Sequence, residues 1–172
     1  KEGKFLTSRN ISERLYKETL SNVSLKVKNT NETDVFEVCG RGELQMAILI
    51  ETMRREGYEF MVSKPQVITK TENDKRLEPV ESVYIDLEEN HVGVVTEKLS
   101  KRKGKMMNLQ NNGFGRVVLE FKVPSRGMIG FRSQFLTDTK GSGVLNSLFH
   151  SYSPWFGSIS QRNSGVIVAD RQ

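Results

Sequence analysis

One pattern occurs twice in this 172-residue chain, and it limits the possible folds more than any other feature. In each half a strand-like run leads through an Arg-Gly pair into a helix-like run, and a further extended run follows. The two pairs, Arg41-Gly42 and Arg126-Gly127, are 85 residues apart. This repeat predicts two similar α/β units rather than one continuous core.

The order of elements around each pair predicts the ferredoxin-like, split βαβ arrangement. In the second half, residues 81–89 alternate as a strand, and residues 92–103 have the apolar spacing of a helix. We expect a hairpin to turn at the Asn-Gly pair 112–113, and a second helix over 128–139. The fold class is therefore α+β, with two α/β sandwich domains and antiparallel sheets.

The first half has the same order with one omission. It predicts a helix over 9–22, strands over 24–28 and 35–39, a helix within 42–57 and an extended closing segment over 58–70. The residues before the first helix are too few for the opening strand. We therefore expect a first copy that lacks this strand, in a chain cut from a longer protein.

A polar stretch separates the two copies. The segment Thr71–Pro79 is poor in apolar residues and is interpreted as a linker. This interpretation gives domains over residues 1–75 and 76–153. Residues 154–172 are too few to bury a core, and we expect them to begin a further domain.

Composition excludes several classes of protein. Hydrophobic residues make up 36% and charged residues 27%, as in folded globular proteins. No apolar run approaches the roughly 20 residues that span a bilayer, so we expect no membrane association. The single cysteine, Cys39, favours a reducing compartment and is interpreted as a small buried hydrophobe.

The sequence shows no motif for catalysis. It has no phosphate-binding loop, and its paired glycines lack the third glycine of a dinucleotide fingerprint. Two histidines and one cysteine are too few for a zinc site made of these residues alone. We therefore expect no catalytic residues, no metal and no cofactor here. A stand-alone enzyme is the third and weakest hypothesis.

Positive charge is concentrated in one region. Between Lys98 and Lys140 there are ten basic residues and two acidic ones, which favours a polyanionic partner. The segment "KLSKRKGK" predicts an RNA-backbone contact at a helix end, although cations also complement a helix C-terminus without any ligand. The candidate contacts in this segment are Lys98, Lys101, Arg102, Lys103 and Lys105.

The segment "VPSRGMIGFRS" supplies a second candidate contact. It places Arg126 and Arg132 about the start of a predicted helix, where unpaired N–H groups attract anions. Arg41 stands in the same position in the first copy. The alternative is a sterically required turn with solvated arginines. Both alternatives stay open at this point.

Several long segments resemble one protein family. They are "GRGELQMAILIETMRREGYEF", "SKPQVITK", "EPVESVYIDLEENHVGVV" and "VPSRGMIGFRSQFLTDTKGSG". Together they resemble the TypA/BipA family of translational GTPases, which is similar to elongation factor G. The resemblance implies that the two copies are domains of the elongation factor G types III and V. Relatives usually carry His where this chain has Gln45, so Gln45 is given no role as a proton donor.

The resemblance also implies a function. The chain would be the ribosome-binding C-terminal portion of such a GTPase, with ribosomal RNA and ribosomal proteins as partners. GTP, magnesium and hydrolysis would belong to a domain outside these residues. The family implies a cytoplasmic protein linked to ribosome assembly, stress and virulence, and we expect a monomer. The alternative is a structural module that couples neighbouring domains without touching RNA.

Overall fold

The computed structural model describes residues 5–160. These residues form two compact units that divide between Pro65 and Gln66. Each unit has its own hydrophobic cluster, so each is described by itself. None of the helices within residues 5–160 has both the length and the apolar character needed to cross a bilayer.

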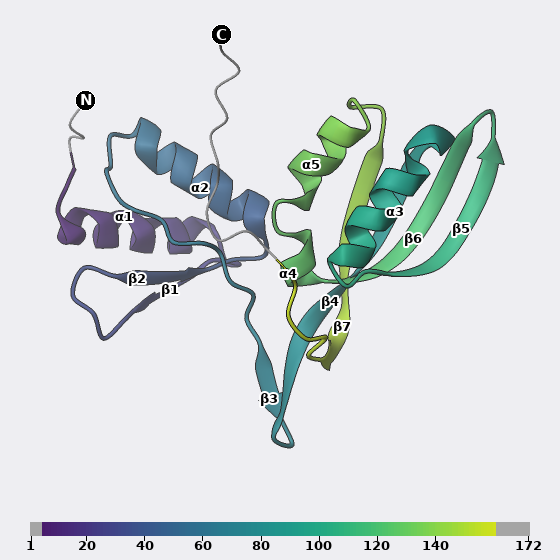
Figure 1. Cartoon of the computed structure of the whole chain (residues 1–172). Helices are drawn as coiled ribbons and strands as arrows, with labels where there is room; N and C mark the ends of the chain where they lie inside the picture. Colours follow the sequence, from purple (N-terminus) through teal and green to yellow (C-terminus); the bar gives the residue numbers. More distant parts are fainter. Residues whose placement is uncertain (1–4, 161–172) are drawn as a thin grey trace, which may run out of the picture. The chain divides into compact units, whose positions relative to one another are not determined.

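The first unit packs two helices on a β-hairpin (Figure 1). Leu15, Leu25, Leu49 and Met53 form its buried centre. The elements are α1 (Ser8–Ser21), β1 (Lys26–Asn29), β2 (Phe36–Cys39) and α2 (Glu43–Arg55).

Two contacts close the first unit. Arg14 of α1 bonds both carboxylate oxygens of Glu56 at 2.5 and 2.9 Å, just beyond the end of α2. Phe5 and Tyr58 form a single parallel bridge and stack with their ring centroids 4.8 Å apart. Within residues 5–160 no strand precedes α1, and the bridge at Phe5 is the one strand-like pairing there. The predicted closing segment makes only this one bridge before residue 66.

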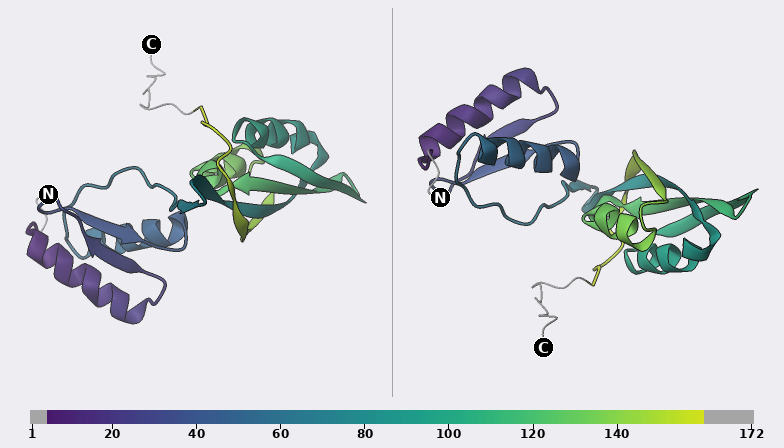
Figure 2. Two further views of the ribbon diagram at one scale, coloured as in Figure 1. Left: turned by 90° about the horizontal axis from the view of Figure 1, so that it is seen from below. Right: turned by 90° about the horizontal axis from the view of Figure 1, so that it is seen from above.

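The second unit contains the complete split βαβ arrangement. Its antiparallel sheet has the order β7–β4–β6–β5, and α3 and α5 cover one face of it (Figures 1 and 2). The predicted α+β class with antiparallel sheets is therefore confirmed. The elements are β3 (Lys70–Glu72), β4 (Lys75–Glu88), a 3₁₀ turn η1 (Glu89–His91), α3 (Val92–Lys101), β5 (Lys105–Gly113), β6 (Arg116–Pro124), α4 (Ser125–Met128), α5 (Phe131–Asp138) and β7 (Val144–Pro154).

Alternation along the central strands produces the core of this unit. From Val83 to Leu87 in β4, and from Val117 to Val123 in β6, every second side chain points toward the helices and is fully or nearly fully buried. Phe131 and Phe135 of α5 complete the cluster on the face of the sheet that the helices cover. The residues from the central strands are Val83, Ile85, Leu87, Val117, Leu119, Phe121 and Val123.

The predicted linker over Thr71–Pro79 is wrong. These residues form the β3–β4 hairpin and the start of the long strand β4. Asn73 and Asp74 both have positive φ, 50° and 59°, which is the geometry of a tight hairpin turn. The segment is polar because its strands project from the sheet into solvent, and polarity alone does not distinguish an exposed hairpin from a linker.

The predicted helix over residues 128–139 also needs correction. It is divided into α4 and α5 by Gly130, which has φ 70°, a conformation that non-glycine residues adopt only rarely. The Arg-Gly pair consequently lies inside α4 and not at the start of the longer helix.

Gly127 is required by close packing. A Cβ atom there would lie 2.7 Å from the backbone carbonyl oxygen of Arg102, at the end of α3, and 3.2 Å from Val123. The backbone of α4 therefore packs directly on the C-terminal end of α3. Of the two alternatives for this turn, the structure supports steric necessity.

Gly127→Ala should lower the free energy of unfolding of the second unit by roughly 1–3 kcal/mol, because the new methyl group must displace backbone. Gly93→Ala is the matched control: nothing lies within 4 Å of a Cβ at that helical position, so no loss is expected. Urea denaturation followed by the fluorescence of Trp155, the single tryptophan, measures both variants. Equal stability of the two variants would refute the packing argument.

Candidate nucleic-acid interface

The predicted cationic segment forms a tight turn between α3 and β5. The carbonyl oxygen of Leu99 accepts hydrogen bonds from the backbone N–H groups of Arg102 and Gly104 at 3.0 and 2.8 Å. Lys103 takes a left-handed conformation with φ 65°, as is common just past a helix end. A Cβ at Gly104 would meet the Leu99 carbonyl oxygen at 2.8 Å, so the chain can turn here only with glycine.

Lys98 is used inside the unit. Its ammonium bonds both carboxylate oxygens of Asp138 at 2.8 and 2.7 Å and so ties α3 to the end of α5. The two side chains are 29% and 16% exposed. Lys98 is therefore neutralised by a partner that is itself half-buried, which makes it a poor phosphate ligand.

Arg102 braces three elements from the end of α3. Its guanidinium donates to the carbonyl oxygens of Gly127 and Ile129 at 2.7 and 3.0 Å, and to Oε1 of Gln134 at 3.1 Å. It also lies 5.3 Å from the centroid of the Phe131 ring. These contacts fix α4 and α5 against α3 and explain why an arginine, with its several fixed donors, stands at this position.

Lys101, Lys103 and Lys105 differ from these two residues because all three are exposed. Lys101 pairs with Glu97 one turn earlier, where the two side chains are 72% and 65% exposed. A hydrogen bond from Lys101, together with its charge, lowers the pKa of the Glu97 carboxyl. Such an exposed pair contributes little to stability and is readily exchanged for another anion.

Lys103 and Lys105 have no carboxylate partner among residues 5–160. Lys105 instead lies directly opposite Lys122 in the β5–β6 ladder. Like charges opposite one another on a sheet are destabilising. The end of α3 and the start of β5 therefore carry positive charge that the described part of the chain leaves unneutralised.

Arg126 is occupied by internal contacts. It donates twice to the carboxylate of Glu78 in β4, at 2.5 and 3.0 Å, and once to the carbonyl oxygen of Gly157. Glu78 is fully buried, and its Oε1 also accepts from the backbone N–H of Phe156 at 2.8 Å. The anion beside Arg126 is thus a carboxylate of the chain itself and not an external phosphate.

A tryptophan completes this cluster. The guanidinium carbons of Arg126 and Arg76 lie 3.8 and 4.1 Å from the centroid of the Trp155 ring. The backbone N–H of Trp155 donates to the carbonyl oxygen of Arg76 at 3.1 Å. The cluster fastens the chain beyond β7 onto the base of the β3–β4 hairpin. Sequence reasoning missed it because Glu78 and Arg76 lay in the segment interpreted as a linker.

Arg132 and Arg41 have different surroundings. Arg132 at the start of α5 donates to the carbonyl oxygen of Leu145 in β7 at 3.1 Å. Arg41 is exposed before α2, and its backbone N–H bonds Oε1 of Gln45 at 2.6 Å. Gln45 also donates to Asn22 and Ser24 at 3.1 and 2.7 Å. Gln45 therefore accepts through its side-chain amide oxygen and donates through its amide nitrogen, and both contacts are made by an uncharged side chain.

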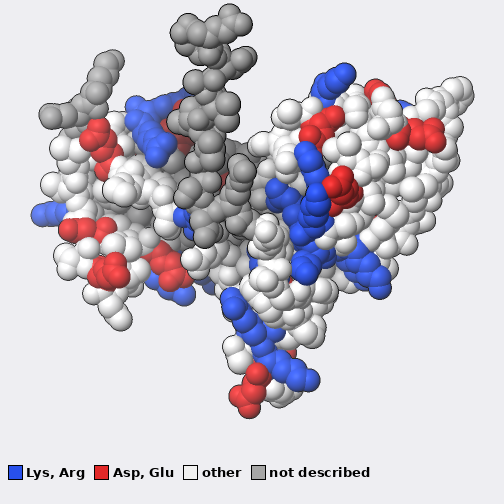
Figure 3. Space-filling model, in the orientation of Figure 1, with Lys and Arg blue, Asp and Glu red and all other residues white. Residues whose placement is uncertain are grey.

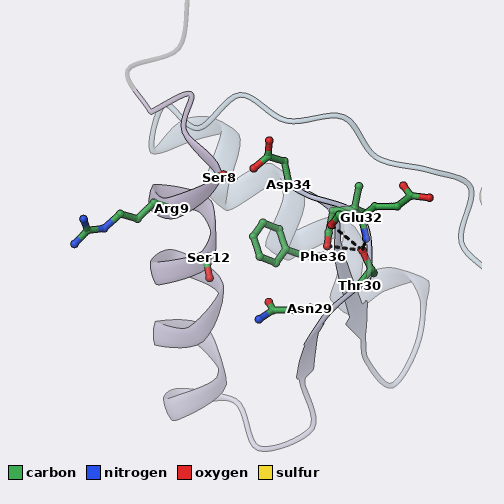
Figure 4. Close-up of a pocket in the computed structure, with 9 residues that line it drawn as sticks. Ser8, Arg9, Ser12, Asn29, Thr30, Glu32, Asp34 and Phe36 are labelled. Atoms are coloured by element: carbon green, nitrogen blue, oxygen red, sulfur yellow. Dashed lines mark hydrogen bonds between the residues drawn. The ribbon is translucent and has the colours of Figure 1, made fainter.

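Neither of two surface hollows among the described residues forms an enclosed site. The hollow in Figure 4, with a volume of about 300 Å³, is wide open and lies between α1 and the β1–β2 loop. Arg9 and Glu32 on its rim point away from one another (Figure 4). Within residues 5–160, no three His, Cys, Asp or Glu side chains come together as metal ligands would.

Comparison with known proteins agrees with this architecture. The sequence profile of the elongation factor G C-terminus matches residues 75–163, which is half of the chain and most of the second unit. The chain belongs to this family. The profile begins at the first residue of β4, so it covers β4, β5, β6 and β7 of the sheet together with α3, α4 and α5, and leaves out only β3.

The most informative relatives extend the similarity to the first unit. The "Large ribosomal subunit assembly factor BipA" of Salmonella typhimurium is 49% identical over the whole chain, and that of Bacillus subtilis is 51% identical over 98% of it. The chloroplastic "Putative elongation factor TypA-like SVR3" of Arabidopsis thaliana is 48% identical over 98%. The predicted resemblance to TypA/BipA is confirmed. The chain spans 25–28% of the length of these relatives.

Glu78→Gln should lower the free energy of unfolding of the second unit by roughly 3 kcal/mol, because it leaves the half-buried Arg126 guanidinium without its counter-charge. Glu97→Gln removes an exposed carboxylate of the same kind and should cost less than about 1 kcal/mol. Urea denaturation with circular dichroism detection compares them. A loss at Glu78 no larger than at Glu97 would show that the buried pair does not hold the cluster.

Proposed function

We propose that the chain is the non-catalytic, ribosome-binding portion of a TypA/BipA-like translational GTPase that acts in assembly of the large ribosomal subunit. The observation that carries the proposal is the exposed, unneutralised charge of Lys103 and Lys105 beside the loosely paired Lys101. The names of the relatives support the choice of partner, since two of the three relatives described above are named as assembly factors of this subunit.

The proposed contact is to the RNA backbone. Phosphates attract lysines regardless of base sequence, and each neutralised phosphate releases counterions. The turn at Gly104 fixes the backbone between Lys103 and Lys105. The two side chains therefore start from a rigid backbone, while their flexible stems let the ammonium groups adjust to the phosphates. Figure 3 shows lysine and arginine side chains gathered on this part of the second unit.

The internal contacts divide the predicted contact residues into two groups. Lys101, Lys103, Lys105 and, in the first unit, Arg41 are proposed to touch RNA. Lys98, Arg102, Arg126 and Arg132 are proposed to shape the surface, because each already bonds groups of its own unit.

The remaining functions are proposed for the whole protein. GTP and magnesium would bind, and hydrolysis would occur, outside these residues. We propose a cytoplasmic monomer that acts on ribosomal RNA and ribosomal proteins, with a role in translation under stress and in virulence. This chain itself would need no cofactor.

A second candidate function is a structural module that couples neighbouring domains without direct RNA contact. The observation that favours it is that several of the predicted contact residues, among them Arg102 and Arg126, bond groups of their own unit instead. A photo-reactive residue at position 103 distinguishes the two functions in a complex with large ribosomal subunits. Crosslinks to RNA support direct contact, whereas their absence supports the module.

Lys103→Asn with Lys105→Gln should weaken binding to purified large subunits and reduce its salt dependence. The slope of log affinity against log salt should fall by roughly 1.4–1.8, at 0.7–0.9 for each lost phosphate contact. Asparagine suits position 103 because it tolerates the positive φ found there. Sedimentation across a salt series provides the measurement.

The matched control replaces two exposed lysines elsewhere, Lys17→Gln with Lys75→Gln, and so removes the same net charge. It should leave the slope within error of the parent chain. If both double variants change the slope equally, the charge acts as a diffuse field and the assigned contact is wrong.

A further inference from the structure

The edge strand β5 continues into a long stretch without charge. From Met106 to Gly115 there are ten residues and no Lys, Arg, Asp or Glu. All of them except Met106 are exposed. Figure 3 shows the flank formed by β5 and its turn as a white surface.

This edge is not protected by charge. Among residues 5–160, β5 pairs only with β6, so its other side presents unpaired backbone groups. Natural proteins commonly cover such an edge or place charges, especially lysines, along it. Here the ladder is irregular between Met106 and Asn108 and between Asn111 and Gly113, which leaves a short regular segment between the two irregularities. Leu109, in that segment, is 49% exposed.

An aromatic side chain stands at the end of this edge. Phe114 is fully exposed and has φ 53°, an unfavourable conformation for a residue of this size. Gly113 and Gly115 on either side also have positive φ, 79° and 74°. The turn is held by a bond from the Gly113 N–H to Oδ1 of Asn111 at 2.8 Å, and by one from Glu89 to the Gly115 carbonyl oxygen at 2.9 Å.

We propose that the β5 edge receives an extended, uncharged segment of a partner protein as an additional strand, with Leu109 and Phe114 as apolar anchors. The lack of charge argues against RNA, which binds through cations, and favours a polypeptide paired through its backbone. The inference rests on the proposed function for the source of the partner, a protein of the large ribosomal subunit. The cationic turn at Lys103–Lys105 would then contact RNA beside the added strand.

The test places a photo-reactive residue at position 110 of the full 172-residue chain, bound to purified large ribosomal subunits. We expect crosslinks to a ribosomal protein, and proteolysis should map them to an extended segment. Leu109→Lys with Phe114→Ser should reduce the crosslink yield at least tenfold. Leu136→Lys, on α5, is the control: Leu136 is also 49% exposed, and its replacement should leave the yield unchanged.

Sedimentation with the subunits separates the two proposals. If the chain sediments but residue 110 crosslinks to RNA, to a second copy of the chain or to nothing, strand addition is overturned and the proposed function stands. If the chain does not sediment, the proposed function fails and the inference falls with it. Circular dichroism of the double variant must match that of the parent chain. If the double variant loses its fold, the Phe114→Ser variant alone is tested instead, and it too should reduce the crosslink yield.

Discussion

The close approach of α4 to the end of α3 is the constraint on which the second unit depends. Only glycine at position 127 permits it, because the carbonyl oxygen of Arg102 occupies the space of a side chain. Once the two backbones meet, Arg102 can reach the carbonyl oxygens of α4 and the residue beyond it. The same approach positions Arg126 beside the buried carboxylate of Glu78. Helix packing, the buried ion pair and the path of the chain beyond β7 thus share one origin.

The positive charge of this unit serves two purposes that composition cannot separate. Lys98 and Arg126 are paired with carboxylates that come from residues 40 and 48 positions away in the sequence. Lys103 and Lys105 lie only a few residues from Lys98 and have no carboxylate beside them within the described residues. A count of charges treats all of these residues alike. The distinction appears only when the fold brings distant elements together, α3 with α5 and α4 with β4.

The sequence predicts local structure well where periodicity is strong. The alternation in "GRVVLEFKV" correctly indicates the β5–β6 hairpin, but its turn is at Phe114 and Gly115 and not at the predicted Asn-Gly pair, which ends β5. The doubled order of elements also identifies the split βαβ topology of the second unit. The hairpin of β3 and β4 was missed because its projecting strands have no apolar face. Partners of Glu78 were missed for a different reason: a buried carboxylate has no local signature, and its arginine lies on another element.

The two edges of the sheet in the second unit are not equivalent. On β7, the carbonyl oxygen of Leu145 is already taken by the Arg132 side chain, whereas no other strand of the described residues pairs with the outer side of β5. A sheet with both edges open could link copies end to end and grow into a filament. The Arg132 side chain obstructs the start of β7, at Leu145, so an added strand would have to displace it there. The proposed guest strand therefore meets less obstruction along β5 than at this end of β7.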